Sequence, residues 1–192
     1  QWMQVLGTSV IHFYPDNKER VEGSLDGKLE KVIYNNKKSF MPHPPGCSMA
    51  IKREYLRRIV GRYSSSWAHD EFFWRMATVD ETCGLLHRSF LRHRMSGTNV
   101  TSLKARSLSE RLAQAQYNVT NYNELLRYAR ETNSNKKCVE IVQYFEKGNA
   151  LRVEFLGKKN VLLFFELIIK YNRIFISNKQ LLGDLFYVVK EM

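Results

Sequence analysis

The feature that most constrains the fold is a regular apolar stripe in the second half of the chain. Apolar side chains recur there at alternating steps of four and three residues, at Leu108, Leu112, Ala115, Val119, Tyr122, Leu126 and Ala129. This spacing places them on one face of an α-helix, and Ser107 with Glu110 fits a capping box at its start. One apolar face needs a cover, so the sequence predicts that further helices pack against this one.

The rest of the chain divides near Thr101 into a mixed part and a helical part. Helices are also predicted at residues 137–146, 160–175 and 180–190. Before Thr101 we expect strands at 4–14, 31–34 and 85–93 and helices at 48–60 and 70–79. The sequence therefore predicts an α/β region over residues 1–101, followed by a mostly α-helical extension over residues 102–192.

The formal net charge of +11 favours anionic partners. Between Arg88 and Lys137 there are ten Lys or Arg residues and three Glu residues, so the surplus is concentrated there. No helix-turn-helix signature, zinc pattern or RNP-type strand is recognisable, so nucleic acid is not the expected partner. An anionic membrane surface fits the charge better.

The cysteines and the apolar runs indicate the compartment. Cys47, Cys83 and Cys138 are odd in number and far apart, which argues against a disulfide framework and a zinc site. No signal-peptide pattern opens the chain, and Glu166 interrupts the longest apolar run, which is too short to span a membrane. The expected location is the cytoplasm, with peripheral contact at the inner membrane face.

Three short motifs between Met41 and Thr101 carry residues suited to chemistry. Gly46 and Cys47 follow a run of prolines, and a glycine there allows close backbone approach. His69 and Asp70 stand at a predicted helix start, where backbone N–H groups and the helix dipole favour a carboxylate. An Arg-rich strand then ends in a turn, and the forked guanidinium of arginine suits a diphosphate.

Each motif also has a simpler interpretation. Asp70 could be a plain N-cap, and His69 an ordinary surface histidine. The glycine loop could be a turn after the prolines, and the arginines could mark a solvated strand edge. Cys47 has no base partner in the sequence, so a nucleophilic role is not expected.

In this order and spacing, the three motifs resemble the C-terminal half of family 2 glycosyltransferases. These are inverting enzymes of the GT-A fold, often bacterial polysaccharide or rhamnosyltransferase-like enzymes. The resemblance covers about residues 1–101 and, more loosely, the helices that follow. It implies an α/β fold, the acceptor-side part of a GT-A nucleotide-diphospho-sugar transferase, and transfer of a sugar from a nucleotide-sugar donor to a saccharide or lipid-linked acceptor hydroxyl.

The resemblance also assigns roles to individual residues. Asp70 would be the general base that accepts the proton of the acceptor hydroxyl. The substrate-binding positions would be His69, Gly46, Cys47, Arg94, His93 and Asn99. The family's strand-end pattern has a Tyr where this chain has His93 and a second His where it has Ser96. Whether His93 replaces that second histidine is left open.

The donor-binding half of the family is missing from this sequence. It contains no D-x-D motif and no Gly-rich phosphate loop. The resemblance implies Mg²⁺ or Mn²⁺ in the full-length enzyme, but this chain alone is expected to bind neither metal nor nucleotide sugar well. The alternative is a non-catalytic basic module that binds a membrane surface or nucleic acid. The sequence leaves open the sugar, nucleotide, acceptor and linkage, and whether a homo-oligomer forms.

The helical extension is expected to pack on itself and on the Asp70 helix. Small residues in the long stripe, such as Ala115 and Ala129, suit helix packing better than lipid insertion. Membrane attraction is therefore expected from scattered Lys and Arg rather than from an inserted helix. The alternatives are that one helix lies on the membrane or on a second copy of the chain.

Overall fold

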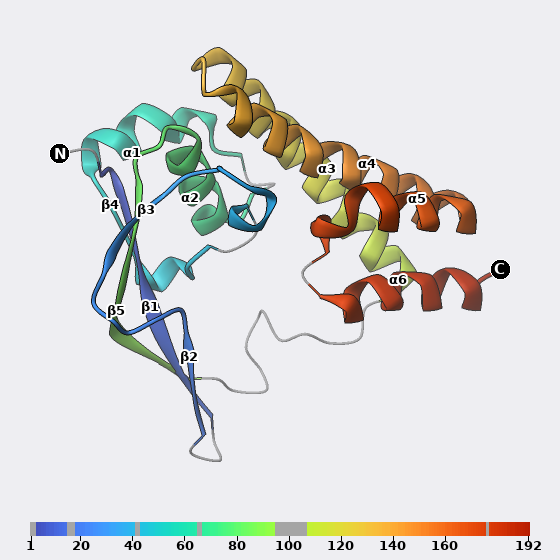
Figure 1. Ribbon diagram of the computed structural model, residues 1–192, viewed down its shortest axis with the longest axis horizontal. Coiled ribbons are helices and arrows are strands. Elements are labelled where there is room, and N and C mark those ends of the chain that lie inside the picture. The colour runs from blue at the N-terminus through green and yellow to red at the C-terminus, as the bar shows by residue number, and fades with distance from the viewer. Residues whose placement is uncertain (1–2, 15–17, 41–42, 65–66, 95–106, 176) are drawn as a thin grey trace. The chain divides into compact units, whose positions relative to one another are not determined.

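The computed structural model describes residues 3–14, 18–40, 43–64, 67–94, 107–175 and 177–192. The chain is mixed α/β and forms two compact units (Figure 1). The first comprises Gln1–Ile33 and Pro42–Lys104, and the second comprises Tyr34–Met41 and Ala105–Met192. The segment Tyr34–Met41 thus belongs to the helical unit, although it lies within the expected α/β region.

The first unit is built on a five-stranded sheet. Its strands are β1 (Val5–Phe13), β2 (Glu19–Glu22), β3 (Leu29–Val32), β4 (Met49–Ile51) and β5 (Cys83–Arg94), in the order β2-β1-β5-β3 with β4 also on β1. β1 and β5 are parallel, and the other pairs are antiparallel. The predicted strands at 4–14 and 85–93 are confirmed as β1 and β5, although only the first two residues of β5 are buried.

One edge of β1 is shared by two short strands. Residues Val5–Gly7 pair with β4, and residues Val10–Phe13 pair with β2. Thr8 and Ser9 lie between these two pairings, at a place where the register with β5 also shifts. The edge of the sheet is therefore interrupted at Thr8 and Ser9.

The helical segments of this unit are short. They are η2 (Gly46–Ser48), α1 (Arg53–Ile59), η3 (Val60–Arg62) and α2 (His69–Val79). The helix predicted over residues 48–60 is wrong for its first part, since Met49–Ile51 forms β4. The free edge of β1 offers backbone hydrogen bonds there, and this tertiary pairing overrides local helix preference. Most of α2 is buried, so it is a core helix.

The second unit is helical. It contains η1 (Lys37–Ser39), α3 (Leu108–Glu131), α4 (Lys136–Lys158), α5 (Val161–Tyr171), η4 (Asn172–Ile174) and α6 (Asn178–Lys190). The stripe on α3 is confirmed, with Ala115, Tyr122 and Ala129 buried against the other helices, and the capping box at Ser107 is present. None of the helices in the described ranges is long and apolar enough to cross a membrane.

α4 runs twelve residues beyond the predicted end at 146. Gly148, Asn149 and Arg152 interrupt the apolar pattern there, yet all three are buried. A Cβ at Gly148 would lie 2.6 Å from Cγ2 of Ile174, so the glycine permits close approach of the η4 segment.

Aromatic contacts place Lys37 and Phe40 in the helical unit. Phe40 is fully buried, and its ring stacks on that of Phe145 with centroids 4.0 Å apart. Tyr122 meets Phe40 edge-on at 5.1 Å, and Nζ of Lys37 lies 3.7 Å from the ring centroid of Tyr144. The core of the helical unit therefore includes an early segment of the chain.

Candidate functional site

The candidate site is built where a turn meets the first residues of α2. The N-cap of α2 is Ala68, and Asp70 is the second helical residue, so the interpretation of Asp70 as a plain N-cap is wrong. Its Oδ1 accepts a hydrogen bond from the N–H of Glu71 at 2.9 Å. Its Oδ2 accepts one from the N–H of Gly46 at 3.1 Å. Two backbone donors therefore hold a half-buried carboxylate at the positive end of a helix.

The turn before β4 fits this carboxylate only because it carries a glycine. A Cβ at Gly46 would lie 2.9 Å from Nε2 of His69 and 3.1 Å from Cβ of Asp70. Real Cβ atoms rarely approach a neighbour so closely, so a side chain here would displace the His-Asp pair. The structure thus brings together three of the predicted residues, Gly46, His69 and Asp70.

A pocket of about 120 Å³ adjoins this turn. Its walls are mostly apolar and come from β1, β2, the proline turn, α2 and β5, namely Thr8, Ser9, Val10, Glu22, Gly23, His43, Pro44, Pro45, Trp74 and Leu85. It therefore opens where the edge of β1 passes from β4 to β2. An apolar cavity of about 150 Å³ holds one benzene ring, so this pocket has room for about one ring.

Trp74 links the pocket to the carboxylate. It lies four residues after Asp70, so the two side chains share one face of α2. Its indole Nε1 is buried and has no hydrogen-bond partner in the described part of the chain. A Cβ at Gly7 would lie 2.7 Å from the Trp74 ring, so the indole is also held closely against β1. The buried N–H is a donor available to a polar group in the pocket.

Trp74 is a site residue that sequence reasoning missed. The aromatic run around it is typical of a core helix, and most of α2 is indeed core. The signal that could have found it is its spacing of four residues from Asp70, which places a hydrogen-bond donor on the same helix face.

The predicted residues on β5 lie elsewhere. His93 pairs with His12 at the far end of β1, and their rings meet edge-on at 5.4 Å between centroids. The proline turn lies at the level of Gly7, five residues earlier on β1, which corresponds to about 17 Å along the strand. His93 and Arg94 are therefore not brought to Asp70, and Asn99 lies outside the described residues.

The remaining predictions concern Cys47 and a metal. Cys47 is exposed beside Gly46, and its thiol is free. Within the described ranges, no three His, Cys, Asp or Glu side chains gather closely enough to hold a metal ion.

The pocket can hold a small ring, and the oriented carboxylate of Asp70 lies at the adjoining Gly46 turn, although Asp70 is not among the lining residues. A carboxylate is chemically suited to accept a proton from a hydroxyl. No protein-family model, curated protein or solved structure matches this chain.

Proposed function

We propose that the first unit is the acceptor-side part of an inverting glycosyltransferase of the family 2 type, with a GT-A fold. The observation that carries this proposal is the hydrogen bond from Gly46 to Asp70. The glycine loop and the His-Asp pair are 24 residues apart in sequence. Their junction in space, without room for a side chain on the glycine, supports the roles that the resemblance implies.

In the proposed reaction, the ring that bears the acceptor hydroxyl occupies the pocket beside Trp74. Asp70 accepts the hydroxyl proton while the oxygen attacks the anomeric carbon of the donor sugar. The bond between that carbon and the nucleoside diphosphate breaks, and the configuration inverts because attack and departure occur on opposite faces. The two backbone donors keep the carboxylate oriented before the proton moves.

The proposed enzyme needs a donor-binding half that this chain does not supply. A divalent metal bound there would neutralise charge on the leaving diphosphate. Among the residues that the structure describes, no group of His, Cys, Asp or Glu side chains could hold that metal. Contacts with the donor are assigned to Arg94, His93 and Asn99 by the resemblance alone.

Two measurements test the proposal. Saturation-transfer NMR with a panel of saccharides should show binding to the 192-residue chain, and Trp74→Phe, which removes the indole N–H, should weaken that binding. Titration calorimetry with nucleotide sugars and Mn²⁺ should show no micromolar binding, which would correspond to about −8 kcal/mol. Micromolar nucleotide-sugar binding, or saccharide binding that is insensitive to position 74, would contradict the assignment.

The rival is a non-catalytic basic module, favoured by the charge of +11. Such a module would bind anionic surfaces but show no saccharide binding near Trp74. Asp70→Asn would then change no activity of the protein, even when it is combined with a donor-binding half. The saccharide panel therefore separates the two functions.

A further inference from the structure

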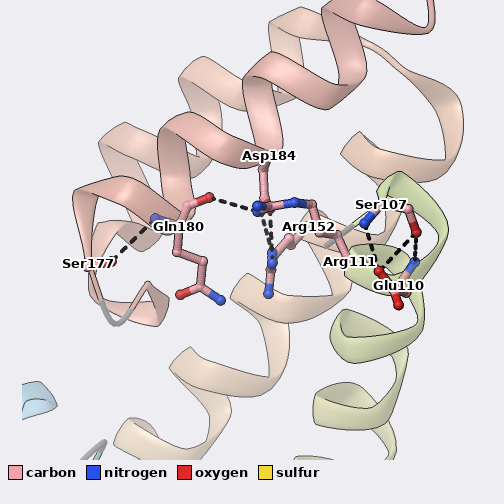
Figure 2. A network of polar contacts seen from close by, with 7 residues as sticks. All are labelled: Ser107, Glu110, Arg111, Arg152, Ser177, Gln180 and Asp184. Atoms are coloured by element: carbon pink, nitrogen blue, oxygen red, sulfur yellow. Dashed lines mark hydrogen bonds and ion pairs between the residues drawn. The ribbon is translucent and has the colours of Figure 1, made fainter. Parts of the chain in front are cut away.

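α6 buries its one acidic residue and exposes several large apolar residues. Its acidic residue, Asp184, is fully buried. There it meets Nε of Arg152 at 2.6 Å and Nη1 of Arg111 at 2.7 Å (Figure 2). Its large apolar residues Leu182, Phe186 and Val189 are exposed instead. Charge inside and apolar side chains outside indicate that something other than water covers the outer face.

α5 repeats this arrangement. Leu162, Phe165 and Ile169 recur at steps of three and four, so they form one stripe along the helix. The opposite face is buried, with Phe164 against Phe155 of α4 at 5.5 Å between ring centroids. The six apolar residues of the two stripes are between 55% and 79% exposed. The outer faces of both helices therefore carry unpartnered apolar side chains.

Both helices contact α4. α5 packs on it at Phe155, and α6 contacts it at Arg152, three residues earlier, and also contacts α3 at Arg111. They are joined at one end by residues 172–177. At the other end Nζ of Lys159, just before α5, donates to the backbone oxygen of Glu191, just after α6, at 3.0 Å. Each helix thus keeps its apolar row exposed on the side away from its packing partners, and the two rows together are here called the α5–α6 surface.

Cations border this surface. Lys179, Leu182, Phe186 and Lys190 follow one another at steps of three, four and four, so a lysine closes each end of the apolar row. Lys179 and Lys190 make no ion pair with any described residue. On α5, the single acidic residue of the helix, Glu166, is paired with Lys170 at 2.8 Å. The surface is therefore apolar with a positive border.

We propose that the α5–α6 surface docks on an anionic lipid membrane, with its apolar side chains inserted at the headgroup level. Lysines beside an apolar row can extend to the phosphates while the row enters the acyl boundary. A second copy of the chain suits the surface less well. A two-fold contact pairs a surface with itself and would bring the lysine borders of the two copies together.

This proposal replaces the expectation that membrane attraction is electrostatic alone. That expectation rested on the stripe of α3, which is buried in the bundle. The helices at 160–175 and 180–190 were predicted to pack with the other helices, and their inner residues Phe164, Leu167 and Val188 are buried, but their outer apolar rows are exposed. Membrane docking is independent of the proposed transferase activity, because all the residues that carry it lie on the helical unit.

Vesicle flotation tests the proposal directly. The 192-residue chain should float with phosphatidylcholine vesicles that contain phosphatidylglycerol, and bind vesicles of phosphatidylcholine alone more weakly. Leu182→Gln with Phe186→Gln should lower the partition coefficient about 10²-fold, since two large apolar groups no longer insert. Lys179→Glu with Lys190→Glu should remove the preference for anionic lipid.

A matched control is Phe90→Gln, which removes a similarly exposed phenylalanine from β5 in the first unit and should leave flotation unchanged. Circular dichroism melting confirms that each variant is folded. Flotation of the Leu182→Gln, Phe186→Gln variant at the unchanged level would overturn the proposal. So would a dimer in analytical ultracentrifugation that this variant converts to monomer, without vesicle binding by the unchanged chain.

Discussion

Gly46 donates its backbone N–H to Oδ2 of Asp70 over 3.1 Å, and so joins a turn to a helix start 24 residues away. The absence of a side chain on Gly46 permits this contact, because His69 and Asp70 fill the space where a Cβ would be. The carboxylate is therefore positioned by the turn as well as by its own helix.

Gly46→Ala should displace the His-Asp pair and destabilise the first unit by about 1–3 kcal/mol, the usual cost of inserting a methyl group into packed space. The measurement is the free energy of unfolding in urea, together with saccharide binding. Gly61→Ala is the control, because a Cβ there meets nothing within 4 Å and alanine suits a helical turn better. Equal stability of the two variants would show that the turn at Gly46 is not tightly packed.

Asp70→Asn should leave the protein folded but less stable by about 1–3 kcal/mol, because the two backbone hydrogen bonds go to different carboxylate oxygens and the amide has only one oxygen to accept with. In the proposed enzyme with its donor-binding half, turnover should fall about 10²-fold or more, since the amide cannot accept the hydroxyl proton. Steady-state kinetics with an acceptor saccharide measures this effect. Turnover close to that of the unchanged enzyme would remove Asp70 from the role of base.

Asp184→Asn should destabilise the helical unit by about 3–5 kcal/mol, because it leaves the buried guanidinium of Arg152 without its counter-charge. Urea unfolding followed by helical circular dichroism measures the loss. Asp26→Asn on the exposed loop of the first unit is the control and should change stability by less than about 1 kcal/mol. A small loss of stability in Asp184→Asn would indicate that water reaches Arg111 and Arg152.

Phe40→Ala should destabilise the helical unit by about 3–5 kcal/mol, because it empties a fully buried site stacked on Phe145. The same helical signal in urea measures this, with Leu25→Ala on the exposed part of the first unit as control. If Phe40→Ala instead affected only the transition of the first unit, the assignment of Tyr34–Met41 to the helical unit would be wrong.

The stability of the first unit should fall in alkali through Cys83. Burial raises the pKa of the Cys83 thiol to about 12, whereas a thiol in the unfolded chain titrates near 8.5. The unfolded state therefore loses its proton first, and stability falls by up to about 1.4 kcal/mol per pH unit between those values. Urea unfolding of the unchanged chain and Cys83→Ala from pH 8 to 11 measures the difference, and parallel pH profiles would contradict it.

The spacing of residues close in sequence predicted the elements that depend only on near neighbours. The stripe on α3 and the capping box at Ser107 are confirmed because both depend on neighbours within a few residues. β4 was missed because its strand conformation comes from the free edge of β1, more than forty residues earlier. The second half of α4 was missed because its buried Asn149 and Arg152 look like surface residues until their partners Asn118 and Asp184 are known.

The candidate site shows the same division. The Gly46 turn and the His-Asp pair were recognised as motifs, and the structure brings them together. Trp74 was taken for an ordinary core aromatic residue. The lack of a hydrogen-bond partner for its buried indole N–H can be recognised only from the structure. The distance between Asp70 and His93 follows from the register of β1 and β5, which no short motif contains.

The place of Phe40 in the helical core has a consequence for synthesis of the protein on the ribosome. Its stacking partner Phe145 is made about 100 residues later, which takes about 5–20 s at ordinary elongation rates. Until then Tyr34 and Phe40 have no core to enter, and the nascent chain carries two uncovered aromatic rings. The first unit therefore emerges with an aromatic segment that holding chaperones can bind until α4 has left the ribosome.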